Sequence, residues 1–535
     1  MICRRGSKER RSTAIGEPKA KTEQMYRCVT LLSESVPEVN THEAKAISSI
    51  RYTIMNKGEI MGGVFGTASR SDCVMDLFFG VDYHSHLGTK NGGMCVFGEK
   101  GFDRTIHSIG DAPFRSKFQD DIESMEGKMG IGAISDTEPQ PLTVYSKLGH
   151  YSLATVGIIN NKDDLVEELI REEKAQFMSM SGGGINNTEL AAALISTKDS
   201  LPEGLRYAQQ KVEGSLTMLA LAPDGLYAAR DYKGRTPLIV GKREDAFCVA
   251  SESFSFINLG YEMFRELAPG EIVKITPDSV ETVMPENTEN VRICTFLWTY
   301  FGYPTAIYEG KNVESMRYRN GAHIAEMDEN DPDLENVDYV AGVPDSGIAH
   351  ALGYAQKSHI PYARPLIKYT PTWPRSFMPP NQKARSLIAK MKLVPDKEII
   401  EGKEFVLVDD SIVRGTQLKD TVTYLYDNGA KRIHIRSACP PILYGCKYLN
   451  FSRSVSDMEL ISRRVIADLE GTEDIPDDVL AEYADCTTER YKNMVEDIKE
   501  ARQFDTLKFQ TLENLLDSVQ VDPCRLCTYC WDGRE

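Results

Sequence analysis

The sequence predicts a two-part fold, with a sheet-rich α+β half followed by an α/β half built on a parallel sheet. Over residues 59–288, short apolar segments such as 130–134 and 215–221 alternate with glycine-rich turns, which is typical of a sheet-rich domain. Over residues 337–438, apolar strands alternate with helical patterns, and such a βαβ series implies parallel strands. The 535 residues are enough for about two to four domains, each with its own core.

The elements follow one another in a clear order. Residues 1–22 are polar and basic and are expected to be disordered, although such a charge run could also contact nucleic acid; residues 23–57 carry only weak helical patterns. In the sheet-rich half two helices are expected, at 163–174 and 187–196. The later elements are a helical connector at 311–327, strands at 337–344, 405–409 and 432–438, helices at 347–357 and 417–428, and an acidic, largely helical tail at 455–520.

Composition narrows the class of protein. Lysine and arginine number 62 against 79 aspartates and glutamates, and the net charge of −17 argues against a general nucleic-acid binder. Neither an apolar run of the ~20 residues needed to cross a bilayer nor a secretory signal is present. The twelve cysteines therefore fit a reducing compartment better than a disulfide framework. We expect a cytoplasmic protein without a membrane or nucleic-acid partner.

One stretch has the composition of a phosphosugar site. The apolar strand 405–408 ends at Asp409 and Asp410, and a turn with Ser411 and Gly415 leads into a helix. Loop N–H groups and a helix N-terminus can hold a phosphate, and two carboxylates can hold ribose hydroxyls and share a magnesium ion. The simpler alternative is a strand that ends in an Asx turn.

The cysteines near the C-terminus form a second candidate site. Cys524, Cys527 and Cys530 are spaced as two overlapping CxxC pairs, which are typical of zinc sites or redox pairs. From spacing alone, a zinc site that also includes Cys294, Cys439 or Cys446 stays open.

These motifs carry a family resemblance. The stretch 405–416 resembles the phosphoribosyl-pyrophosphate (PRPP) signature of type I phosphoribosyltransferases, and the chain from residue 59 onward resembles the glutamine PRPP amidotransferases. The resemblance implies an N-terminal-nucleophile (Ntn) hydrolase-like α/β sandwich at 58–290 and a type I phosphoribosyltransferase parallel-sheet domain at 291–454. A partly disordered extension at 1–57 precedes them, and a helical tail with the cysteine cluster follows at 455–535.

The resemblance also implies a set of site residues. Magnesium would be held by Ser346, Asp409 and Asp410. Ser346 is also expected as a helix N-cap, and both roles can hold together because an N-cap serine already faces the phosphate side. The implied PRPP-binding residues are Asp345, Ser346, Gly347, Lys368, Asp409, Asp410, Ser411, Arg414, Gly415 and Thr416. In the family's mobile lid, Lys368, Arg375 and Phe377 are retained but residues 369–371 differ. PRPP binding is therefore expected, and efficient transfer is in doubt because lid closure assembles the site.

Some members of this family hold a [4Fe–4S] cluster with four cysteines. The matching places are filled here by Cys294, Cys446, Cys527 and Cys530, which implies a structural cluster, with zinc as the alternative. Cys439 and Cys524 would then be spare.

The glutaminase motifs of the family are degenerate in this chain. Gly62 stands in the place of the nucleophilic cysteine, and residues 86–90 read His-Leu-Gly-Thr-Lys where the family has His-Arg-Gly-Gln-Asp. The oxyanion-hole Asn-Gly-Asn is replaced at 156–160, and the substrate-anchoring Ser-Asp by two asparagines at 186–187. Cys73 and Cys95 follow no activating base and are not expected to substitute. We expect glutamine hydrolysis to be lost.

The resemblance implies an amidophosphoribosyltransferase-like protein of purine biosynthesis that binds PRPP and Mg²⁺ and, if active, forms 5-phosphoribosylamine from ammonia. Two alternatives stay open. One is a non-catalytic regulator that binds PRPP or purine nucleotides and pairs with an active amidotransferase, since the family forms homo-oligomers. The other is a phosphoribosyltransferase that uses a different nucleophile.

Overall fold

The computed structural model describes residues 62–178, 180–181, 184–369, 393–449 and 456–535. The predicted extension at 1–57 and most of the lid segment, with Arg375 and Phe377, lie outside these residues. Among the helices that the structure describes, none has the length and apolar character needed to span a membrane.

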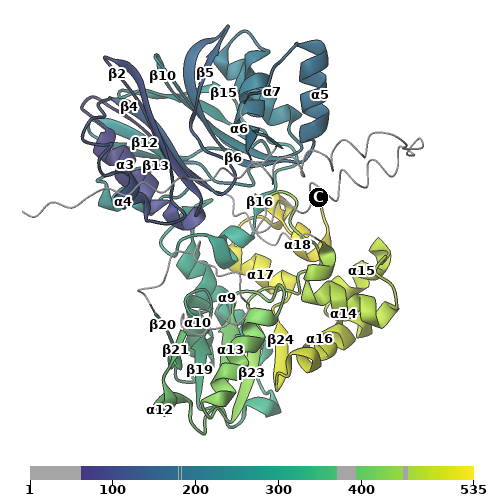
Figure 1. The fold of residues 1–535 in the computed structure, drawn as a ribbon. Helices are drawn as coiled ribbons and strands as arrows, with labels where there is room; N and C mark the ends of the chain where they lie inside the picture. Colours follow the sequence, from purple (N-terminus) through teal and green to yellow (C-terminus); the bar gives the residue numbers. More distant parts are fainter. Residues whose placement is uncertain (1–61, 179, 182–183, 370–392, 450–455) are drawn as a thin grey trace, which may run out of the picture. The chain divides into compact units, whose positions relative to one another are not determined.

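The N-terminal half is a sandwich of two antiparallel sheets with helices on its outer faces (Figure 1). The first sheet has the order β13 (Glu262–Glu266), β11 (Ile239–Arg243), β12 (Ala246–Ala250), β1 (Gly63–Ser69), β4 (Met129–Ser135), β2 (Asn91–Gly98) and β3 (Gly101–Ser108). The second has the order β15 (Val280–Met284), β14 (Ile272–Ile275), β10 (Gly225–Ala229), β9 (Gly214–Ala222), β6 (Gly149–Ile159) and β5 (Leu142–Ser146). Every residue of β1 is buried, as expected for a strand covered on both faces.

Helices cover both sheets of the sandwich. α3 (Val74–Tyr83), α4 (Phe114–Phe118) and α8 (Ser255–Asn258) lie on the first sheet, and α5 (Lys162–Glu172), α6 (Asn187–Ser196) and α7 (Leu201–Lys211) lie on the second. The predicted helices at 163–174 and 187–196 are confirmed as α5 and α6. The expectation of two helices was wrong, because α3, α4, α7 and α8 form as well. α7 forms although it contains Pro202, since proline is tolerated in the first turn and Ser200 caps the helix.

A connector joins the two halves. It consists of β16 (Ile293–Cys294), the π-helix η2 (Leu297–Phe301), β17 (Ile307–Tyr308), β18 (Lys311–Asn312) and α9 (Val313–Met327). The predicted helix at 311–327 is confirmed as α9, which begins after Asn312 because the Asn312 side chain accepts a hydrogen bond from the Ser315 N–H.

The C-terminal half is built on a four-stranded parallel sheet in the order β19 (Tyr339–Gly342), β22 (Glu404–Asp409), β23 (Arg432–Ser437) and β24 (Thr506–Phe509). Around it lie α10 (Ile348–Ser358), α12 (Lys397–Ile400), α13 (Thr416–Asp427) and the hairpin of β20 (Leu366–Lys368) and β21 (Leu393–Pro395). The predicted strands and helices of this half are confirmed within a few residues.

The tail is mainly helical, as predicted, with α14 (Ile461–Glu470), α15 (Asp477–Ala484), α16 (Glu489–Arg502), α17 (Leu512–Val519), β25 (Leu526–Cys527) and α18 (Tyr529–Asp532). It also supplies β24, the edge strand of the parallel sheet, which was not predicted. Four residues between two helices carry too short a pattern to be recognised as a strand.

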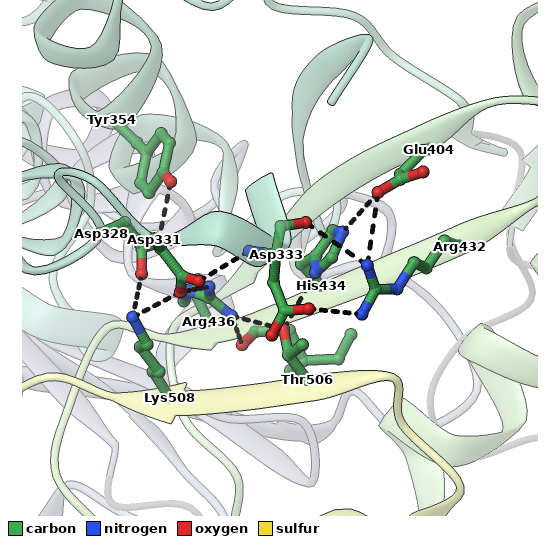
Figure 2. A network of polar contacts seen from close by, with 11 residues as sticks. Asp328, Asp331, Asp333, Tyr354, Glu404, Arg432, His434, Arg436, Thr506 and Lys508 are labelled. Atoms are coloured by element: carbon green, nitrogen blue, oxygen red, sulfur yellow. Dashed lines mark hydrogen bonds and ion pairs between the residues drawn. The ribbon is translucent and has the colours of Figure 1, made fainter. Parts of the chain in front are cut away.

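A buried polar layer ties β24 to the rest of the half (Figure 2). Arg436 of β23 is fully buried, and its Nε donates to Oδ2 of Asp328 at 2.6 Å, just after the end of α9. Asp328 also accepts from Lys508 of β24 at 2.8 Å and from the Tyr354 hydroxyl of α10 at 2.8 Å. One carboxylate therefore joins two strands and two helices, and its charge is compensated as burial requires.

Candidate active site

The acidic pair lies where β22 ends, at the carboxyl edge of the parallel sheet. The Asp410 N–H donates to Oδ1 of Asp409 at 3.0 Å, and the Ser411 hydroxyl donates to Oδ1 of Asp410 at 2.6 Å. Burial, and then the charge of Asp410, raise the pKa of Asp409 well above its ordinary value, and burial raises the pKa of Asp410. Two buried carboxylates this close repel each other, and a hard cation such as Mg²⁺ would offset that repulsion.

Ser346 completes the acidic site from the neighbouring strand. It lies in the turn between β19 and α10, and its hydroxyl contacts Asp409 and Asp410, partly offsetting the rise in the pKa of both carboxyls. The N-cap of α10 is Gly347 and no side chain caps this helix, so the expected N-cap role of Ser346 is wrong. A Cβ on Gly347 would lie 2.2 Å from the Val408 oxygen, so only glycine lets this turn approach β22 so closely.

A cationic side chain faces the same turn from the hairpin. Lys368, the last residue of β20, lies with its Nζ 2.5 Å from Oδ2 of Asp345, and both side chains are half exposed. The Pro344–Asp345 peptide bond is cis. Residues 345–347, 368 and 409–411 therefore meet at one edge of the sheet although they come from three different segments.

Residues 411–416 form a loop, called here the phosphate loop, that leads from the acidic pair into α13. Gly415 is the N-cap residue of α13 with φ +66°, and no side chain caps the helix. The first N–H groups of α13 are thus left for a ligand, which is the arrangement that favours an anion. The Arg414 guanidinium forms an ion pair with Glu459. The backbone oxygen of Arg414 accepts hydrogen bonds from two residues of the helical tail, Arg464 and Arg502.

A buried arginine behind the acidic pair was missed by sequence reasoning. Arg317 of α9 is 4% exposed, and it donates to the carbonyl oxygens of Trp298 at 2.8 Å and Gly302 at 3.0 Å. Its positive charge lowers the pKa of Asp410 against the effect of burial. No local motif marks Arg317, because its role depends on how α9 packs against the connector.

The four candidate ligand cysteines are gathered in one region of the fold. Cys294 of β16 stands opposite Cys527 of β25 in a parallel pair. Burial raises the pKa of the Cys294 thiol, and Cys527 and Cys446 lie close enough to raise it further. The Cys530 carbonyl accepts from the N–H groups of residues 443 and 444, just before Cys446. Within the described ranges, however, no three histidine, cysteine, aspartate or glutamate side chains are arranged as a metal-binding group.

The N-terminal half has no room at the place of the missing nucleophile. Gly62 has φ +115°, and a Cβ there would lie 2.5 Å from the Ile134 carbonyl oxygen. The cavity beside Gly62, also lined by Leu87 and Val156, has a volume of about 10 Å³. That is space for about one water molecule.

The remaining glutaminase-like positions have structural roles. His86 lies with its Nε2 2.6 Å from Oε2 of the buried Glu252, and the Asn186 side chain caps α6. Burial raises the pKa of the Cys73 thiol and raises that of Cys95 to about 11. A buried thiol held in its protonated form is a poor nucleophile.

Comparisons with known proteins agree with this geometry. The glutamine amidotransferase domain family matches residues 128–258. The amidophosphoribosyltransferase of Methanocaldococcus jannaschii is 31% identical over 416 residues, which cover 72% of this chain and 86% of the relative. The amidophosphoribosyltransferase of Synechocystis sp. is 28% identical over 493 residues, which cover 90% of this chain and 91% of the relative.

Solved structures show the same fold. The glutamine PRPP amidotransferase of B. subtilis, solved in complex with ADP and GMP, superposes with a TM-score of 0.74 at 28% identity, covering 88% of this chain and 96% of that one. A structure described as the allosteric regulatory enzyme of purine biosynthesis gives 0.73 at 27% identity. The predicted fold class, an Ntn-type sandwich followed by a phosphoribosyltransferase domain, is confirmed.

Proposed function

The chain belongs to the amidophosphoribosyltransferase family, and on that premise we propose that it binds PRPP with Mg²⁺ and transfers the phosphoribosyl group to ammonia, as in purine biosynthesis. The observation that carries the proposal is the meeting of Asp409, Asp410 and Ser346 beside the uncapped N-terminus of α13. We propose the same division of the chain as the sequence predicts, at 1–57, 58–290, 291–454 and 455–535.

Each part of the site would hold one part of PRPP. The phosphate loop and the first turn of α13 would bind the 5-phosphate, and residues 345–347 with Lys368 would bind the pyrophosphate. The acidic pair would accept hydrogen bonds from the ribose hydroxyls, and Ser346, Asp409 and Asp410 would hold Mg²⁺. Mg²⁺, when bound, neutralises charge on the departing pyrophosphate.

The reaction is a displacement at the ribose C1. The lone pair of ammonia forms the C1–N bond while the C1–O bond to pyrophosphate breaks, and the nitrogen then loses a proton to water. The positive charge of Arg317 would stabilise the ionised form of Asp410. The site residues position the two reactants and supply no covalent intermediate.

We propose that glutamine hydrolysis is lost. Gly62 carries no nucleophile, and its backbone leaves no place for a side chain, because a Cβ there would lie 2.5 Å from the Ile134 carbonyl oxygen. The ammonia would therefore come from solution or from a separate glutaminase. The same observation favours a second candidate function, a PRPP-binding regulator that pairs with an active amidotransferase.

We further propose that Cys294, Cys446, Cys527 and Cys530 ligate a [4Fe–4S] cluster, with Zn²⁺ as the alternative. What supports it is the pairing of Cys294 with Cys527 and the proximity of Cys446 to both. Thiolates suit either group, and a cluster here would bind the tail to the connector. Anaerobically purified protein should contain iron and absorb in the visible range, whereas colourless protein with stoichiometric zinc would contradict the cluster.

One assay tests the proposed function. Pyrophosphate release from PRPP–Mg²⁺ is measured with ammonia, with glutamine and with neither, and we expect release with ammonia alone. Release with glutamine, accompanied by glutamate, would contradict the loss of the glutaminase. PRPP binding without pyrophosphate release under any condition would favour the regulator.

A further inference from the structure

Two tail helices hold the phosphate loop from its outer side. The Ile461 N–H, at the start of α14, donates to the Val413 oxygen at 2.8 Å. Arg464 of α14 and Arg502 of α16 each donate through Nη2 to the Arg414 oxygen, at 3.0 Å and 3.1 Å. Two successive loop carbonyls are therefore bound by elements that lie more than forty residues further along the chain.

These bonds decide where the loop's N–H groups point. In a trans peptide the carbonyl and the following N–H point in opposite directions. Because the carbonyls of Val413 and Arg414 are bound on the tail side, the N–H groups of Arg414 and Gly415 face the other way. In the part of the chain that the structure describes, neither N–H donates to a backbone acceptor. Successive N–H groups of this kind form an anion-binding concavity.

The two arginines occupy positions that are electrostatically unfavourable without an anion. Arg464 lies at the end of the first turn of α14, the positive end of the helix dipole. Burial, and then the charge of Arg464, lower the pKa of Arg502. The Nε atoms of both are buried without a hydrogen-bond partner among the residues described. Two neighbouring cations are thus kept beside the loop at a cost in stability.

The backbone of the phosphate loop also accommodates the Arg502 side chain. At Gly415, with φ +66°, a Cβ would lie 2.7 Å from Nε of Arg502. The positive φ disfavours any side chain at residue 415, and a Cβ there would also have to displace the Arg502 side chain. Loop and tail therefore pack directly against each other.

We propose that Arg464 and Arg502 are positioning residues that form an arginine brace, which orients the N–H groups of the phosphate loop toward the ligand and adds positive potential for a dianionic phosphate. The identity of that ligand, the 5-phosphate of PRPP, rests on the proposed function. The orientation of the loop does not rest on the proposed function, because it follows from hydrogen bonds within the chain.

The test uses the full-length protein and hydrogen exchange at residues 411–416 without ligand. The variant R464Q/R502Q removes both charges and most of the donors, and we expect loop amides to exchange about tenfold faster because two charged hydrogen bonds are lost. The affinity for PRPP–Mg²⁺ should fall about tenfold, with a weaker dependence on salt. R464K/R502K should restore the salt dependence and only part of the slowed exchange.

The matched control is R490Q. Arg490 is also on α16, but it forms ion pairs with Glu470 at 3.0 Å and with Glu482 at 2.9 Å. The R490Q substitution should therefore leave hydrogen exchange in the loop and the affinity for PRPP unchanged. Loop exchange in R464Q/R502Q equal to the wild type would overturn the brace. If the wild type binds no PRPP, the proposed function fails while the exchange comparison still decides the brace. Should the double variant unfold, R502Q alone tests the brace, with a smaller expected increase in loop exchange because Arg464 still donates to the Arg414 oxygen; exchange equal to the wild type would overturn it.

Discussion

Alanine at Gly62 tests whether the position just before β1 has room for the side chain of a nucleophile. The free-energy cost has two parts. A non-glycine residue at φ +115° costs about 1–3 kcal/mol in backbone strain. A Cβ 2.5 Å from the Ile134 oxygen also overlaps it, and relieving such overpacking costs about 1–3 kcal/mol more. G62A should therefore lose about 2–6 kcal/mol of unfolding free energy.

The matched control is Gly101, the first residue of β3 in the same sheet. Its φ is +92°, and a Cβ there meets nothing within 4 Å. G101A should therefore show the backbone cost alone, and the difference between the two variants measures the overlap with Ile134.

Urea unfolding followed by circular dichroism gives the two losses, and hydrogen exchange in β4 localises them to the sheet. A G62C variant, with the preceding residues removed so that the cysteine is N-terminal, should release no glutamate from glutamine. The reasoning is refuted if G62A is as stable as G101A, or if G62C hydrolyses glutamine.

Three further predictions concern the C-terminal half. D409N should be more stable than the wild type at neutral pH without Mg²⁺. The raised pKa of Asp409 gives stability below its unfolded pKa of about 3.9 that is lost as pH rises through the folded value, and urea unfolding across pH should show a larger loss in the wild type than in D409N, which keeps only the contribution of Asp410. E459Q should free Arg414 from its ion pair and tighten PRPP binding about two- to fivefold by calorimetry, and weaker binding would contradict this. R436M should lose at least about 2 kcal/mol, somewhat below the usual cost of breaking a buried pair because Lys508 still contacts Asp328; an unchanged urea midpoint would contradict it.

Much of the fold was predictable because its strands are apolar runs that end in recognisable turns. The end of β22 at Asp409 follows from four apolar residues before two carboxylates. The sequence did not predict the elements whose formation depends on tertiary contacts or on a capping side chain. β24 is a strand only because β23 offers it a parallel partner, and α7 forms despite Pro202 because Ser200 caps it.

The residues of the candidate site likewise fall into those that the sequence predicts and those that only the folded structure reveals. Asp409, Asp410 and Ser346 are visible in sequence because they stand at strand ends whose order along the chain implies proximity. Arg317 and Arg502 are not visible, because each lies on a helix of ordinary composition. Their importance comes from carbonyl oxygens and carboxylates that reach them only in the folded chain.

The pairing of β16 with β25 has a consequence for the order of events during synthesis. Residue 294 finds its partner at residue 527, so residues 295–526 must all be synthesised before this ladder can close. Domains that emerge first fold first. The sandwich can therefore form before β16 has its partner strand, which makes closure of this ladder a late step of folding.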